Sequence, residues 1–176
     1  MVDFNYFKKN LWLSALLGGI VGLIAFFTPA WSYSALLTEA AVVWLWNMIY
    51  YINDGLGVMS GQIVFIPTEE AIFSLGIICT LILIIGAVIL LVPAILGKRK
   101  SVRIYNILWL IGGILSIISP IIYLVGSEVY SSGFWTHYIV SAGLILPFIA
   151  GAFGLSAGIT GILKQREQKD EIDKKF

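Results

Sequence analysis

Residues 71–97, AIFSLGIICTLILIIGAVILLVPAILG, decide the fold, because the whole stretch lacks Asp, Glu, Lys, Arg and His. A helix needs about 20 predominantly apolar residues to cross a hydrocarbon core of about 30 Å. At about 1.5 Å per residue this helix would reach roughly 40 Å, so it would tilt or project beyond the membrane. The sequence therefore predicts a transmembrane helix over 71–97.

Three further stretches, 11–30, 104–126 and 138–163, also lack Asp, Glu, Lys, Arg and His. The chain is 59% hydrophobic and 12% charged, whereas soluble domains are about 45–50% apolar and about 25% charged. We predict an all-α membrane protein: a four-transmembrane-helix bundle over 1–163 with a charged tail over 164–176. The first stretch is too long for a signal-peptide core, so we expect it to be retained as a span.

The basic residues predict the orientation. All Lys and Arg precede the first predicted span, lie between the second and third, or follow the fourth. The positive-inside rule then places both termini in the cytoplasm, with outer loops over 31–70 and 127–137, and we expect a plasma-membrane protein. Lys98, Arg99, Lys100 and Arg103 form a basic turn that sets the topology and is also a candidate site for anionic lipid headgroups.

The first outer loop is unusually apolar. Residues 42–52 are rich in β-branched and aromatic side chains, Asn53-Asp54-Gly55 is a turn signal, and 62–66 is a second strand candidate. We predict a small extracellular β-hairpin cap, to which Val129 and Tyr130 add a strand. An amphipathic interfacial helix over Leu36–Ile52 is the alternative.

Two sets of residues are candidate contact sites. On a strand, Trp44, Trp46 and Tyr50 would share one face and pack on the bundle. The opposite face would then present an outer-loop contact for a partner or a second copy, made of Leu45, Ile49 and Tyr51. Small residues at four-residue spacing predict close helix packing, within one copy or between copies, at Gly18, Gly22, Gly112, Ser116, Ala150, Gly154 and Gly158.

The sequence offers no catalytic constellation. His137 is the only histidine and Cys79 the only cysteine, and no nucleophile–base–acid set is visible. We expect no catalytic residues, no cofactor and no metal, with His137 as an interfacial residue; an outer cation site with Glu69, Glu70 and Glu128 is the alternative. Spans without Asp, Glu, Lys, Arg or His argue against a pump or coupled transporter, and no nucleic-acid partner is expected.

The chain resembles the claudin and peripheral-myelin-protein family of tetraspan proteins. Pro29-Ala30-Trp31 stands where that family leaves its first span through Pro-x-Trp, and Leu45-Trp46 matches part of its Gly-Leu-Trp loop motif. The two loop cysteines of the family are missing here. The resemblance implies four spans, inner termini, a β-sheet in the outer loops, and work by lateral assembly and adhesion.

We therefore expect a non-enzymatic membrane protein that organises or shapes membrane, or mediates adhesion, by lateral self-association. The alternatives are an auxiliary subunit of a larger membrane complex and, less expected, an ion or small-molecule conduit.

The orientation is testable by cysteine labelling in intact cells, in a variant that lacks Cys79. A cysteine at Lys100 should react with a membrane-impermeant reagent only after the cells are opened, because all basic residues lie on that side. A cysteine at Gly57 should react from outside. The reverse pattern would contradict the orientation.

Overall fold

The computed structural model describes residues 10–35, 39–46, 48–53, 60–65, 71–97 and 103–173. Helices and strands follow one another as α2 (Leu11–Phe27), β1 (Trp31–Ala35), β2 (Glu39–Val43), β3 (Met48–Asn53), β4 (Ser60–Phe65), α3 (Ala71–Gly97), α4 (Arg103–Tyr130), α5 (Phe134–His137), β5 (Ile139–Val140) and α6 (Ala142–Asp173).

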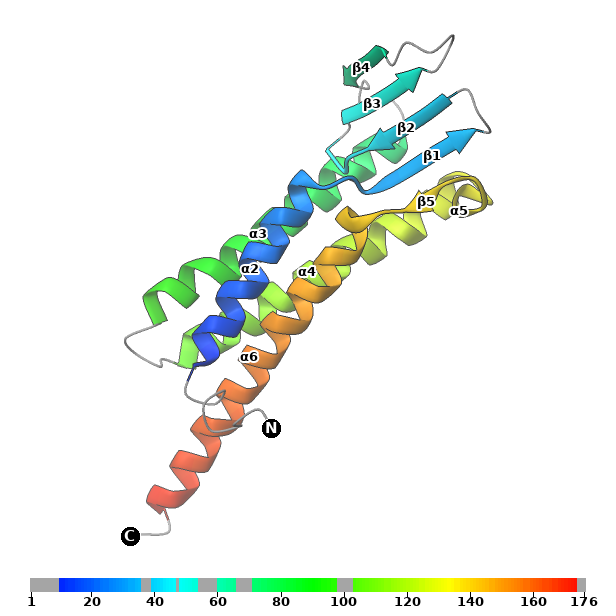
Figure 1. Cartoon of the computed structure of the whole chain (residues 1–176). Helices are drawn as coiled ribbons and strands as arrows, with labels where there is room; N and C mark the ends of the chain where they lie inside the picture. Colours follow the sequence, from blue (N-terminus) through cyan, green and yellow to red (C-terminus); the bar gives the residue numbers. More distant parts are fainter. Residues whose placement is uncertain are drawn as a thin grey trace, which may run out of the picture.

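Four helices form an elongated bundle with a β-sheet at one end (Figure 1). Around the bundle the order is α2, α3, α4, α6, so that each helix packs mainly on two neighbours. By length and composition, Ser74–Gly97, Arg103–Tyr130 and Ala142–Asp170 are able to cross a membrane. α2 is apolar but has only 17 residues. The structure thus contains three helices of membrane-spanning length, and a fourth crossing stays a prediction.

Small residues allow the helix backbones to meet inside a single copy. All seven residues of the predicted packing set are buried. A Cβ on Gly18 would lie 2.8 Å from the carbonyl oxygen of Ala150, and one on Gly112 would lie 2.9 Å from that of Gly86. These contacts show that the set packs the helices of one copy together; its use between copies stays a prediction.

Glycines on both helices bring the backbones of α4 and α6 together. A Cβ on Gly113 would lie 2.7 Å from the amide nitrogen of Leu155 and 2.9 Å from the carbonyl oxygen of Gly151. On the other side, a Cβ on Gly154 would lie 2.9 Å from the Cα of Gly113. Since neither backbone can move aside cheaply, only glycine fits at this crossing.

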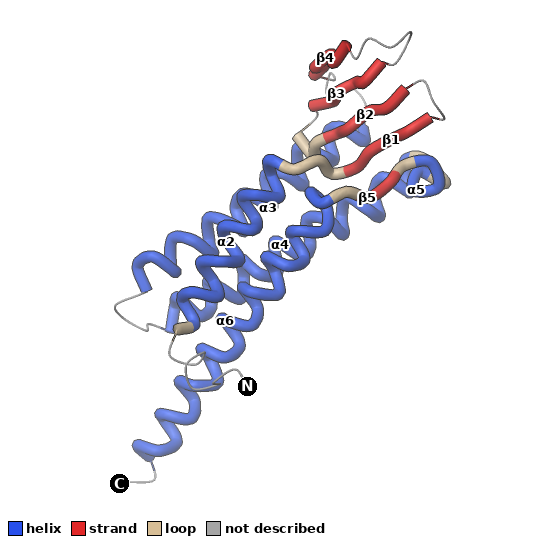
Figure 2. Tube along the Cα trace, in the orientation of Figure 1, coloured by secondary structure: helices blue, strands red, loops and turns tan. Residues whose placement is uncertain are grey.

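The sheet at the end of the bundle has five strands in the order β4-β3-β2-β1-β5, and each pairing is antiparallel (Figure 2). The predicted hairpin is present as β3 and β4, joined across residues 54–59, with Tyr50 opposite Ile63. The sheet is larger than the predicted cap, because β1, β2 and β5 extend it beyond this hairpin.

Three details of the predicted cap are wrong. The segment 42–52 is not one strand, since β2 ends at Val43 and β3 begins at Met48. The alternative helix over Leu36–Ile52 is excluded by the strands that its described residues form. Val129 and Tyr130 end α4, and the added strand is instead β5.

Backbone hydrogen bonds fasten the sheet to the helices that enter it. Ala30 N–H donates to the carbonyl of Val43 at 2.7 Å, and Ser141 N–H donates to the carbonyl of Ala30 at 2.9 Å. Gly143, in the first turn of α6, donates to the carbonyl of Pro29 at 2.7 Å. A Cβ on Gly143 would lie 2.5 Å from the carbonyl oxygen of Thr28, so a side chain here would push α6 away from the end of α2.

The α4–α6 crossing predicts a large effect of one substitution. Gly113→Val places three carbons against the backbone of α6 and should lower the free energy of unfolding by about 1–3 kcal/mol or more, measured in detergent. Ala152→Val is the control, because Ala152 is exposed on the outside of α6. Equal melting temperatures for the two variants would contradict the crossing.

Candidate functional site

The sheet rests on an aromatic junction between the first and second loops. Trp31 of β1 donates its indole N–H to the hydroxyl oxygen of Tyr123 on α4 at 2.8 Å, and both side chains are buried. The Trp31 ring also meets Phe134 and Tyr138 edge-on, with ring centroids 5.4 Å and 4.6 Å away. This junction fixes the position of β1, and hence of the whole sheet, on the bundle.

The Trp-Leu-Trp segment is a turn that clamps the sheet to α2. Trp44 donates its indole N–H to the carbonyl of Phe27 at 2.9 Å, and Trp46 donates to that of Phe26 at 3.0 Å. Both carbonyls belong to the last turn of α2, where no intrahelical donor is available. Leu45 between them is only 4% exposed and packs in the apolar core beneath the sheet.

The predicted outer-loop contact is therefore corrected at Leu45. Strand alternation does not apply to Trp44, Leu45 and Trp46, because the chain turns there and the two indoles bind carbonyls of α2. Leu45 faces inward and offers no surface to a partner. Ile49 and Tyr51 belong to β3, opposite Val64 and Gln62, and their side chains lie outside the described part of the structure.

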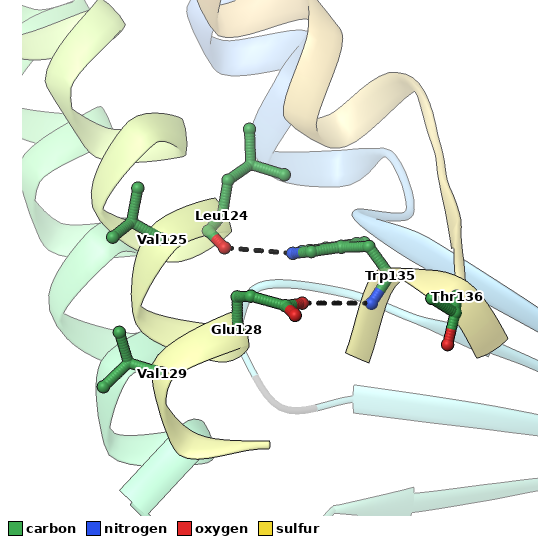
Figure 3. Close-up of a pocket in the computed structure, with 6 residues that line it drawn as sticks. All are labelled: Leu124, Val125, Glu128, Val129, Trp135 and Thr136. Carbon is green, nitrogen blue, oxygen red and sulfur yellow. Dashed lines mark hydrogen bonds between the residues drawn. The ribbon is translucent and has the colours of Figure 1, made fainter. Parts of the chain in front are cut away.

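A groove of about 590 Å³ lies between the end of α4 and α5 (Figure 3). Its walls are largely apolar, and its one carboxylate, Glu128, points at the backbone of the turn. The Glu128 oxygens accept from Gly133 N–H at 2.7 Å and from Trp135 N–H at 3.5 Å, while the Trp135 indole donates to the carbonyl of Leu124 at 3.0 Å. Glu128 therefore stabilises a turn in which Gly133 has a positive φ of 78°.

The structure leaves the predicted outer cation site without support. Glu128 is engaged in the turn, and His137 is exposed at the end of α5. Glu69 and Glu70 lie outside the described residues. Among the residues that are described, no group of three His, Cys, Asp or Glu side chains is placed to hold a metal ion.

One edge of the sheet is a candidate interaction surface. β4 is the outermost strand, and no other described strand pairs with its far side. Its sequence, SGQIVF, contains neither a charge nor a proline, the features that usually protect exposed sheet edges. At the other edge, β5 has only two residues. β4 is thus the longer template for another strand.

The opposite end of the bundle carries a second candidate surface. A groove of about 380 Å³ is lined by Arg103 at the start of α4 and, on α6, by Ile162, Gln165, Arg166 and Lys169. Of the predicted headgroup residues, Arg103 takes part, whereas Lys98, Arg99 and Lys100 lie outside the described residues. Sequence reasoning missed Arg166 and Lys169, because only the α4–α6 packing brings them to Arg103. The only sequence signal was that the four α6 residues are spaced three or four apart, which places them on one face of a helix.

No protein-family model matches this sequence, and no curated protein matches it significantly.

The aromatic junction gives a testable double-mutant cycle. Tyr123→Phe leaves the indole N–H of Trp31 buried without its acceptor and should lower the free energy of unfolding by about 1–3 kcal/mol. Tyr130→Phe, the same change at an exposed tyrosine, should have little effect. Trp31→Phe combined with Tyr123→Phe should cost less than the sum of the single changes. Additive effects would show that the bond contributes nothing.

Proposed function

We propose that the protein is a non-enzymatic tetraspan membrane protein that organises membrane by lateral self-association through its sheet-capped end. The observation that carries this proposal is the uncharged six-residue edge strand β4. The resemblance to claudins points to the same kind of work and remains a prediction, as does the placement of the sheet outside the cell.

Membrane insertion is supported by what the bundle presents outward. The exposed side chains of α3, α4 and α6 include a long series of Ile, Leu and Val, with Ile78, Leu81, Ile85, Val88 and Val92 on α3 alone. Apolar surface of this extent is expected to face lipid. Residues 104–126 and 138–163 contain no Asp, Glu, Lys, Arg or His.

α2 is shorter than the usual membrane-spanning helix. Its 17 residues reach roughly 26 Å, against about 30 Å of hydrocarbon. Local thinning of the bilayer compensates a difference of this size at a modest cost. α2 also packs along α3 and α6, so that it lies at the same depth as they do. We therefore include α2 as the fourth span.

Self-association through β4 has a defined geometry. Two copies related by a twofold axis would place their β4 strands antiparallel, joining two five-stranded sheets into one. Such a pairing satisfies backbone N–H and C=O groups on the outer edge of β4 without any particular side chain. Facing residues of antiparallel strands have Cα atoms about 4.5–5.5 Å apart, a distance that a disulfide can bridge.

A cysteine scan of β4 in membranes tests this arrangement. In a Cys79→Ala background, single cysteines at positions 60–65 should give oxidised dimers with a maximum at the twofold centre. A cysteine two positions from the centre would be roughly 14 Å from its equivalent and should not crosslink. The readout is the fraction of dimer after mild oxidation.

Single cysteines at Ile139 and Val140 of β5 are the matched control, and we expect no dimer there. A dimer fraction that is low and equal at all six positions of β4 would refute the proposed pairing. The mass of the intact complex from native membrane decides the alternative role: an unrelated protein bound to a single copy would favour an auxiliary subunit.

A further inference from the structure

Three cationic side chains meet at the end of the bundle away from the sheet. Arg103 comes from the first turn of α4, and Arg166 and Lys169 come from α6, beyond the long apolar run that ends at Leu163. They line one groove of about 380 Å³ together with Gln165 and Ile162. Three like charges repel one another, and an anion bound in the groove would offset that repulsion.

Helix geometry explains the convergence. Residues 162, 165, 166 and 169 follow the spacing i, i+3, i+4, i+7, which places them on one face of α6. The start of α4 is held against that face by Asn106, which is 1% exposed. A Cβ on Gly158 would lie 2.9 Å from the carbonyl oxygen of Asn106, and one on Gly161 would overlap the amide group of its side chain. Arg103 precedes Asn106 by one helical turn and so lies beside α6.

The charge of the groove is not neutralised by its described lining, which contains no carboxylate. At about 100° per residue, Glu167 lies on roughly the opposite side of α6, and Asp170 is about a quarter-turn away from the centre of the groove. The N-terminus of α4 adds partial positive charge next to Arg103.

The groove lies where apolar surface gives way to charge. Ile104, Ile159 and Leu163, next to it in the chain or one helical turn away, are 57%, 49% and 51% exposed. From Lys164 onward α6 is charged and continues past the other helices (Figure 1). If the bundle crosses a bilayer, as proposed above, the groove lies at the level of the lipid headgroups.

We propose that this groove binds the headgroup phosphate of an anionic phospholipid. Arg103 and Arg166 offer planar guanidinium groups that bind phosphate oxygens through paired hydrogen bonds. Lys169 adds a third charge, and the Gln165 amide adds a neutral donor. The exposed isoleucines beside the groove would contact the acyl chains, which is the reason for choosing a lipid over a free anion. The inference rests on the proposed membrane insertion, but not on self-association.

The test measures lipid binding to the full-length protein in detergent by native mass spectrometry. Short-chain phosphatidylglycerol is titrated beside phosphatidylcholine of the same chain length. Arg103→Gln and Arg166→Gln should each weaken phosphatidylglycerol binding roughly fivefold, the effect of one interfacial charge. Lys164→Gln removes one charge from roughly the opposite side of α6 and should change binding less than twofold. Melting temperatures without lipid confirm that the variants are folded.

Equal weakening by all three substitutions would overturn the groove in favour of diffuse attraction. Displacement of phosphatidylglycerol by an equal concentration of inorganic phosphate would overturn the lipid and leave a site for free phosphate. The two proposals can fail independently. Lipid binding at the groove without β4 crosslinks would refute only self-association. Crosslinks at β4 without lipid binding at the groove would refute only the lipid site. Release of the protein from membranes by alkaline carbonate would refute membrane insertion, on which both rest.

Discussion

The backbone contact between α4 and α6 at Gly113 and Gly154 is the constraint on which the other features depend. Lipid tails are as apolar as the helices, so helices in a bilayer associate through close packing more than through the hydrophobic effect. This crossing fixes where α4 lies along α6, and therefore positions both ends of α4. Toward the sheet, it places Tyr123 beneath Trp31. Toward the other end, it brings Arg103 to the charged face of α6.

The helices could be predicted from sequence because one property, the absence of charge over a long run, is sufficient to identify them. Segment 71–97 is a single helix as predicted, and α6 continues into the charged tail. The β3–β4 hairpin was predictable from the sequence Asn53-Asp54-Gly55, a turn signal between two strand candidates. The turn at Trp44-Leu45-Trp46 was not, because its aromatic residues favour strands and its geometry depends on carbonyls of α2. A strand as short as β5 forms only because β1 is beside it.

The candidate surfaces were harder to predict than the fold, because they depend on contacts between elements that are distant in sequence. The sheet edge is defined by which strands pair, and the basic groove by which helices touch. Arg103 and Arg166 are distant in sequence, and no local pattern indicates that they share a groove. By contrast, the small-residue rows follow a local four-residue spacing that the sequence displays, and the structure shows which helices of the same copy they contact.

The continuity of α6 has a consequence for anything that binds beyond the membrane. α6 begins at Ala142, directly after the sheet, and runs without interruption to Asp173, so its charged part is a stiff spacer. Residues 164–173 extend it by roughly 15 Å past its apolar section. A protein attached there would be held at a fixed distance and in a fixed direction relative to the sheet. The spacing between the sheet and such an attachment is therefore set by the length of one helix.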